Sequence, residues 1–508
     1  MPVARDLLRG DDHGDEMMFT HALIRDGAYA SLLHASRREL HQKAALWYEG
    51  RDPALCAEHL DRAEDARAAD AYLAAARAEA NAMRTEAALA LVTRGRQLPS
   101  GAAARFGLAA LAGELYARLG HAAESIGAFE SALDAAADDR ERAAAWIGVA
   151  SGHRMQSAIG KGLAALDAAE ESAGRACLTA QLARIAYLRG SLHFSAGAAG
   201  ECRRHHERAL ALAHQAGDTE CEAQALSGVA DALYAQGQMR SAQAAFRRCL
   251  DICERAGLKR LMPMNQCMVA IVDALFGRID NALAQFREAR RLAHDLRDRF
   301  AETMCDESAG FVLAYCGRYA DAAEPLTRGI ALARTVAARR FEVILYTALA
   351  FVRAHDGRND EARACLDLAW SRSNDVGPRF AGPLVVGARA RLAASDDERR
   401  AALAEGERLL RDECVAHCHL AFYHWGIDAL LDAREWESVD RYADLLERAM
   451  HDEPLPVIEL LIARARALAA AGRGEPDPAA LAACLDRARA WDLTAYLPPL
   501  EAALAAAA

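Results

Sequence analysis

The sequence predicts an all-α fold in which antiparallel helix pairs repeat about every 40 residues and stack into a superhelix. Three observations support this prediction. Ala, Leu, Arg and Glu are abundant, whereas alternating runs of β-branched residues, which would indicate strands, are almost absent. Seven glycines that separate helical segments stand 40, 37, 40, 40, 40 and 40 residues apart. Columns of small and large residues recur at fixed distances from these glycines.

The glycines mark the expected turn inside each helix pair, because glycine readily adopts the left-handed backbone that ends a helix. The residues five and twelve positions after each glycine are small in all seven units. The residue seven positions before it is small in every unit except one, where His153 stands. The residue nine positions after it is mostly large. The seven glycines are Gly120, Gly160, Gly197, Gly237, Gly277, Gly317 and Gly357.

These columns have a physical reason. Two antiparallel helices approach closely only where their side chains are small, and a bulky side chain then fills the space between neighbouring pairs. Weaker units on both sides of the seven bring the expected total to about eleven helix pairs.

Two stretches resemble the second helix of the tetratricopeptide repeat (TPR): "GQMRSAQAAFRRCLDICERAG" from Gly237 and "GRYADAAEPLTRGIALA" from Gly317. The resemblance implies a TPR-like α-solenoid whose unit is lengthened here. Glycine and proline cluster in "SRSNDVGPRFAGP" from Ser371, and the column pattern fades after it. We therefore expect TPR-like helical repeats over residues 51–375 and degenerate helical repeats over residues 376–508.

The N-terminal stretch "FTHALIRDGAYASLLHASRRELHQKAALWYEG" from Phe19 resembles a junction in large bacterial signalling proteins. In that family an AAA-type P-loop ATPase, often preceded by a class III adenylate or guanylate cyclase, passes through a winged-helix-like segment into a repeat arm. Phrases from Ala416 and Glu453 agree with the same family. We expect residues 1–50 to be a remnant of the junction, with the ATPase and cyclase missing from these 508 residues. Besides Met1, Met17 and Met18 are alternative starts.

Motifs for nucleotide chemistry and catalysis are incomplete in the sequence. Lys161 in "SAIGKGLAAL" lacks both the first glycine of a P-loop and the Ser or Thr that must follow the lysine. The stretch "VAIVDALF" from Val269 could mimic a Walker B strand, but its position predicts the first helix of a repeat. No HExxH or GxSxG motif occurs. We therefore expect neither an enzyme nor a cofactor.

One metal-binding alternative comes from "ECVAHCH", which places Cys414, His417 and Cys418 at i, i+3 and i+4. On a helix these residues share one face and could supply three ligands to zinc or copper, although a buried helix face is the favoured explanation. The adjacent His205 and His206 project in different directions on a helix, so we do not expect them to share a ligand. The thirteen cysteines form no CxxC pair, which favours reduced thiols.

Composition excludes two classes of partner. The net charge of −11 argues against a nucleic-acid surface, which requires excess basic residues. No apolar run reaches the roughly 20 residues of a membrane helix, and the N-terminus lacks the apolar stretch of a signal peptide. We therefore expect a cytoplasmic protein. The C-terminal "AYLPPLEAALAAAA" contains no helix-turn-helix pattern, which weighs against a DNA-binding regulator.

A candidate binding groove follows from the repeats. Positions thirteen, six and two before the turn glycine lie on one stripe of the first helix, and by resemblance to peptide-binding repeats this stripe faces the concave surface. The stripe is apolar, which suits either a groove for a peptide, an amphipathic helix or an apolar ligand, or simple packing between helices. Its residues in the central units are Met264, Ile271, Leu275, Met304, Phe311, Tyr315, Ile344, Phe351 and His355.

We therefore expect a non-catalytic protein–protein interaction, sensor or regulatory module. Its partner would be a protein, such as a separately encoded ATPase or cyclase, or a peptide. One alternative is the regulatory C-terminal part of an ATP-binding cyclase or of a transcriptional regulator whose catalytic part is missing. A second alternative is a metal-binding helical protein. The sequence leaves the identity of the partner and the oligomeric state open.

Overall fold

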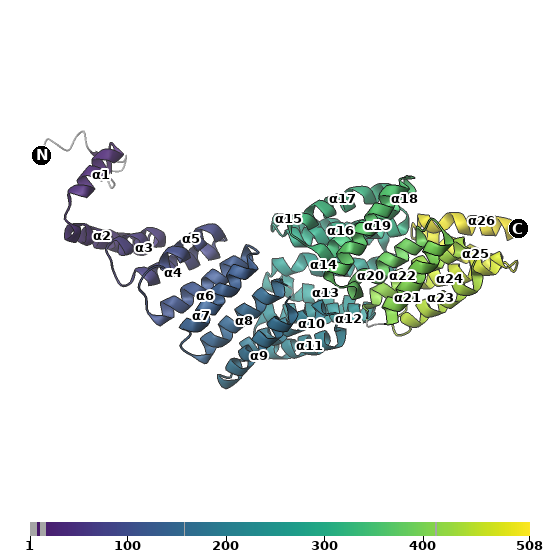
Figure 1. The fold of residues 1–508 in the computed structure, drawn as a ribbon, viewed down its shortest axis with the longest axis horizontal. Coiled ribbons are helices and arrows are strands. Elements are labelled where there is room, and N and C mark those ends of the chain that lie inside the picture. The colour runs from purple at the N-terminus through teal and green to yellow at the C-terminus, as the bar shows by residue number, and fades with distance from the viewer. Residues whose placement is uncertain (1–7, 11–16, 157, 412–413, 508) are drawn as a thin grey trace. The chain divides into compact units, whose positions relative to one another are not determined.

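The computed structural model of the protein describes residues 8–10, 17–156, 158–411 and 414–507 (Figure 1). These residues form two compact units, Met1–Gln181 and Leu182–Ala508, whose boundary falls within helix α10 (Thr179–Ser195). The expected junction remnant (residues 1–50), TPR-like repeats (51–375) and degenerate repeats (376–508) differ in the type of repeat, and this division stays a prediction.

The first unit begins with a short ribbon and continues as helices. Strand β1 (Leu8–Gly10) pairs antiparallel with β2 (Met17–Phe19), with Leu8 opposite Phe19. This ribbon is a small departure from the expected helix throughout. The helices are α1 (Ala22–Ser31), α2 (His34–Tyr48), α3 (Pro53–Arg62), α4 (Ala68–Asn81), α5 (Thr85–Gly95), α6 (Ala102–Arg118), α7 (Ala122–Ala135), α8 (Asp139–Met155) and α9 (Ile159–Arg175).

The second unit is helical throughout its described residues. It also contains two short 3-10 helices, η1 (Lys259–Leu261) and η2 (Thr494–Tyr496). After α10 come α11 (Ala199–Ala216), α12 (Thr219–Ala235), α13 (Met239–Ala256), α14 (Met262–Leu275), α15 (Ile279–Asp295), α16 (Arg299–Cys316), α17 (Tyr319–Thr335), α18 (Arg339–His355), α19 (Asn359–Val376), α20 (Pro378–Arg391), α21 (Asp396–Arg411), α22 (Ala416–Asp432), α23 (Trp436–Ala449), α24 (Pro456–Gly472), α25 (Pro478–Ala490) and α26 (Leu497–Ala507).

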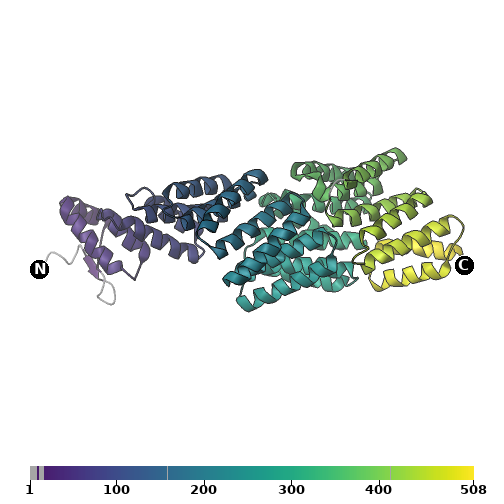
Figure 2. The ribbon, with the colours of Figure 1, turned by 90° about the horizontal axis from the view of Figure 1, so that it is seen from below.

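Successive helices pack as antiparallel pairs, and within each unit the pairs stack one on the next (Figure 2). Helices α4 to α25 form eleven such pairs among the described residues. The prediction of an all-α array of helix pairs is therefore confirmed. Among the described helices, none combines the length and the apolar character that crossing a membrane requires.

The turn glycines behave as predicted in six of the seven units, and the seventh shows an error of register. Gly120, Gly197, Gly237, Gly277, Gly317 and Gly357 all have positive φ. Gly160 does not, because it is the second residue of α9, which begins at Ile159. The turn of that unit therefore comes before Ile159, and residue 157 is outside the described residues.

Counting from the start of the second helix removes the exception at His153. In the other six units the second helix begins two residues after the turn glycine, and the positions that match α9 in this count are Ala150 and Leu166, which are both buried. In this register helices α9, α11, α13, α15, α17 and α19 begin 40 residues apart, at Ile159, Ala199, Met239, Ile279, Tyr319 and Asn359.

The small columns exist because a large side chain from each second helix is wedged between two first helices. In the first unit a Cβ atom on Gly113 would lie 2.6 Å from the Phe129 ring, and a Cβ on Gly148 would lie 2.3 Å from it. In the second unit Gly190 and Gly228 enclose the ring of His206 in the same way, at 2.7 and 2.4 Å. No side chain larger than hydrogen fits at these four glycines without displacing the ring.

The stretch that could mimic a Walker B strand lies in helix α14, as its position in the repeat predicts. Its Asp273 is a buried structural acceptor. The carboxylate accepts hydrogen bonds from Gln243 Nε2 (2.6 Å), Arg278 Nη2 (2.5 Å) and Gln285 Nε2 (2.7 Å). Burial alone would raise the pKa of Asp273, but these hydrogen bonds hold it below its ordinary value. Asp273 therefore joins α13, α14 and α15. These contacts explain its burial without nucleotide binding.

Two turn glycines offer a matched test of how the C-terminus docks. Gly317 and Gly357 both have positive φ, but a Cβ on Gly317 would lie 2.5 Å from the backbone N of Ala495 in η2, whereas a Cβ on Gly357 would meet nothing within 4 Å. We expect Gly357→Ala to cost about 1 kcal/mol through backbone strain. Gly317→Ala should cost at least about 1 kcal/mol more and should make residues 478–507 more sensitive to protease. Equal melting temperatures and equal proteolysis of the two variants would contradict this contact.

Candidate functional site

The C-terminal helices of the second unit fold back over the first helices of its central repeats. The Tyr496 hydroxyl donates to the Tyr315 carbonyl (2.9 Å), and Thr494 Oγ1 donates to the Cys316 carbonyl (3.0 Å). The Glu453 carboxylate accepts from the backbone N–H groups of Arg240 (2.6 Å) and Ser241 (3.1 Å) at the start of α13. The concave surface of the central repeats is therefore covered by the same chain, and two adjoining cavities remain beneath the cover.

The first cavity has a volume of about 240 Å³. Helices α12, α14, α16 and α18 form one side of it, and α20, α22 and α24 contribute the other. Apolar side chains make up most of the wall. Seven of the nine predicted stripe residues line it, namely Met264, Ile271, Leu275, Met304, Phe311, Tyr315 and Ile344.

The second cavity is larger, about 660 Å³, and adjoins the first at Phe311 and Tyr315, which line both. The two remaining stripe residues, Phe351 and His355, line this cavity. The Phe351 ring lies 4.8 Å from the ring of Trp425 in α22, which also lines it. The structure thus brings all nine stripe residues to the walls of two cavities. Whether these walls bind a partner stays a prediction.

Three charged residues on the first cavity were not among the predicted site residues: Asp231 in α12, Glu307 in α16 and Arg340 in α18. Burial raises the pKa of Asp231 to about 7 and that of Glu307 to about 7, while the charge of Arg340 acts in the opposite direction on both. Ser308 Oγ donates a hydrogen bond to Glu307 Oε2 (3.0 Å). The Arg340 guanidinium lies 5.7 Å from the centre of the Phe194 ring.

A sequence signal for one of these charges was present. Asp231 stands six positions before Gly237, which is the same stripe position that Ile271 and Phe311 occupy in the next two units. A carboxylate on an otherwise apolar stripe points to a polar contact at that place. Glu307 and Arg340 lie outside the stripe positions, so only the structure brings them to the cavity.

The second cavity contains compensated charges. Arg464 Nη1 pairs with Asp428 Oδ1 at 2.7 Å, and Arg391 Nη1 pairs with Asp432 Oδ2 at 2.5 Å. His424 Nε2 lies 3.5 Å from Asp428 Oδ2, yet burial lowers the pKa of His424 to about 4, so its ring is neutral near pH 7. The two acids and the two arginines of the second cavity leave no net charge there.

The first cavity differs, because its two carboxylates face one arginine. Ionisation of both carboxylates therefore leaves an excess negative charge.

The residues of the metal-binding alternative, Cys414, His417 and Cys418, do not all lie on one helix. Helix α22 begins at Ala416, so Cys414 precedes it and does not share a helix face with the other two residues. Cys414 Sγ contacts the Leu409 carbonyl (3.2 Å), and Cys418 is fully buried. Burial raises the pKa of the Cys418 thiol, which disfavours the thiolate that a metal needs. Within the described residues, three ligand atoms come together instead at His193, Glu201 and His205.

Comparison with known proteins agrees with the repeat fold. A family model described as a tetratricopeptide repeat matches residues 181–255, which span most of α10, all of α11 and α12, and most of α13. No curated protein matches the chain. The fold of the chain is a TPR-like repeat of helix pairs.

Solved structures give distant likenesses. A Rap protein complexed with competence and sporulation factor is 14% identical over 79% of this chain and 100% of that chain, with a TM-score of 0.49. The apo form of RapI is 13% identical over 68% of this chain and 99% of that chain, with a TM-score of 0.48. Aspartyl phosphate phosphatase F from Bacillus subtilis is 12% identical over 53% and 70%, with a TM-score of 0.44.

The buried Glu307 predicts a pH-dependent stability. Its folded pKa of about 7 lies above the ordinary value of 4.5, so the folded state binds the proton more tightly than the unfolded state. Stability is therefore lost as the pH rises from about 4.5 to about 7, and Glu307→Gln removes this loss. We expect the variant to gain up to about 3 kcal/mol over the wild type at about pH 8 but little at about pH 4.

Urea unfolding of both proteins at the two pH values checks this expectation. Glu324→Gln, on the neighbouring helix α17 with a side chain that is 83% exposed, is the matched control and should show no such pH dependence. An unfolding difference between wild type and Glu307→Gln that is the same at both pH values would show that Glu307 is not held protonated by the fold.

Proposed function

We propose that this chain is a non-catalytic sensor or interaction module whose second unit binds a peptide segment of a protein partner. The observation that carries the proposal is the convergence of the nine stripe residues on two adjoining cavities, the first of which also holds Asp231, Glu307 and Arg340. Apolar concave sites with a few polar groups are typical of ligand binding.

The walls indicate what kind of segment would bind. Met264, Met304 and Phe311 provide adaptable and aromatic surface for apolar anchor side chains. The first cavity has more carboxylates than arginines, which favours a basic group on the ligand. A cation that loses its water there is stabilised by the opposite charge of Asp231 and Glu307. We therefore propose a short apolar peptide segment that carries an arginine, a lysine or a free amino terminus.

A non-catalytic role agrees with the state of the reactive groups on the walls. Burial raises the pKa of Cys316 to about 12, so its thiol is not a nucleophile near neutral pH. His424 is neutral, but its two ring nitrogens make no hydrogen bond that would pair it with a nucleophile. The cavities therefore support binding better than group transfer.

Selection from a random-peptide phage library on the full chain tests the proposed binding. We expect the selected peptides to combine apolar side chains with a basic group. Phe311→Asp should weaken their binding by about tenfold or more while circular dichroism shows unchanged helicity, with Ile344→Asp as a second variant. Leu368→Asp, on α19 where the side chain is already 42% exposed, is the control and should bind like the wild type.

The pH dependence of peptide binding tests the proposed charge contact. Asp231 and Glu307 ionise as the pH rises through about 7, so affinity for a basic peptide should increase on the order of tenfold between about pH 5.5 and about pH 8. Selected peptides without a basic group, or affinities that do not change with pH, would contradict the charge contact. Peptides that bind Phe311→Asp and Ile344→Asp as tightly as wild type would contradict the cavity itself.

We further propose that the chain acts as the regulatory arm of an ATPase, with or without an adenylate or guanylate cyclase. A transcriptional regulator is the alternative. The sequence resemblance places the ATPase junction near Phe19, and large apolar side chains are exposed in this part of the described chain. Such a surface suits contact with another domain. The exposed residues are Phe19, Leu23, Tyr29, Leu33, Leu40, Leu46 and Trp47.

The intact mass of the native protein, isolated from its own cells, tests this regulatory role. A covalently attached ATPase would give a mass well above 54.8 kDa. A mass of 54.8 kDa would require the partner to be a separate chain, and co-purification of an ATPase that is lost in Leu33→Asp and Leu46→Asp would then be expected. A free chain of that mass without such a partner would contradict the regulatory arm.

A further inference from the structure

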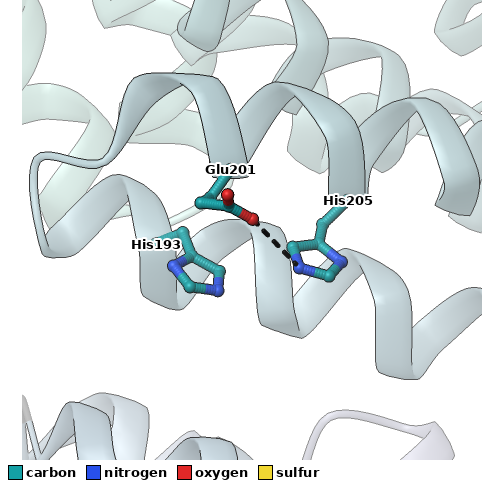
Figure 3. Close-up of side chains that lie close together, drawn as sticks. All are labelled: His193, Glu201 and His205. Atoms are coloured by element: carbon teal, nitrogen blue, oxygen red, sulfur yellow. Dashed lines mark ion pairs between the residues drawn. The ribbon is translucent and has the colours of Figure 1, made fainter.

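Helices α10 and α11 bring together three side chains that ligate metals in proteins. His193 lies in the last turn of α10, and Glu201 and His205 stand one helical turn apart at the start of α11. One ligand atom from each residue lies within 4.8 Å of those of the other two. Figure 3 shows the three side chains on facing helices, with a dashed line between His205 and Glu201. His205 Nε2 lies 3.9 Å from Glu201 Oε2. The two imidazole rings are stacked, with centroids 5.2 Å apart and planes 5° from parallel.

We propose that His193, Glu201 and His205 form a binding site for a transition-metal ion of the zinc class. Two imidazole nitrogens and one carboxylate oxygen are a ligand set that Zn²⁺ uses in proteins, with a fourth position left for water. All three residues are partly exposed, so an ion can reach them. The site lies apart from the two cavities, and the proposal does not depend on peptide binding.

The turn between the helices positions the ligands. Gly197, with φ of +77°, reverses the chain directly after His193 and returns α11 alongside α10. The spacing of Glu201 and His205 at i and i+4 then places both on the side of α11 that faces His193. The next residue, His206, is excluded because its ring is wedged between Gly190 and Gly228. Of the two adjacent histidines, His206 therefore packs between helices and His205 faces the proposed metal site.

The surroundings of the two histidines disfavour a positive charge on their rings. Burial, followed by the charge of neighbouring groups, lowers the pKa of His205 to about 4, and burial also lowers the pKa of His193.

Nearby arginines set a limit on the affinity. Arg204 pairs with Glu201, and Arg189 and Arg208 add positive charge around His205. An incoming ion must replace Arg204 at the carboxylate. The Arg204 side chain is 69% exposed, so the loss of this surface ion pair costs little. We therefore expect weaker binding than that of a closed structural zinc site.

Titration of the reduced full chain with Co²⁺, followed by displacement with Zn²⁺, tests the site. We expect one equivalent of Co²⁺ to give visible ligand-field bands without an intense sulfur-to-cobalt charge-transfer band, because no thiolate is a ligand. His193→Ala and His205→Ala should each weaken binding about tenfold or more, and Zn²⁺ should raise the melting temperature of the wild type but not of these variants. His214→Ala, on the same helix with a side chain that is 82% exposed, should bind like the wild type.

Three results would overturn the proposal. These are the absence of stoichiometric binding, binding that persists in both His193→Ala and His205→Ala, and a sulfur-to-cobalt band that disappears in Cys414→Ala. Circular dichroism of each metal-free variant checks that it is folded. If either alanine variant misfolds, Glu201→Gln, which keeps the shape of a half-exposed side chain, decides between the outcomes by the same titration.

Discussion

The close approach of neighbouring helices is the constraint on which the rest of this structure depends. A large side chain from each second helix is wedged between two first helices, and this packing is possible only where the facing residues are glycine, alanine or another small residue. Phe129 between Gly113 and Gly148, and His206 between Gly190 and Gly228, show the same arrangement in the two units. Because the wedge must recur in every pair, the helix starts recur every 40 residues through α19.

This repetition also creates the candidate site. Stacking the first helices in register places their stripes next to one another, so that Ile271, Phe311 and Phe351 come from three different repeats to adjoining walls. The C-terminal helices then cover the stripes through contacts such as Tyr496 to Tyr315 and Glu453 to the start of α13. A surface that the repeats alone would leave open becomes two cavities with buried charges. The cover explains how one stripe can both pack and leave space for a ligand.

The sequence could predict the features that recur and could not predict those that depend on distant segments. Periodicity identified the helix pairs, the turn glycines and the nine stripe residues. It misplaced one turn at Gly160, because a glycine within α9 was taken for the turn glycine. It could not bring Glu307 and Arg340 to the stripe, nor reveal that residues 416–496 cover it. The sequence did not point to His193, because it belongs to a different helix from Glu201 and His205, and it did not show that α22 begins only at Ala416, after Cys414.

We propose that the covered stripe of the second unit receives a ligand. Site-specific photo-cross-linking tests it most directly, with benzoylphenylalanine placed at Ile344, on the cavity wall, and at Leu368, on the exposed side of α19, in the presence of a library-selected peptide. We expect a peptide adduct from position 344 that an excess of unlabelled peptide suppresses, and no adduct from position 368. Equal cross-linking from both positions, or an adduct from position 368 alone, would contradict it.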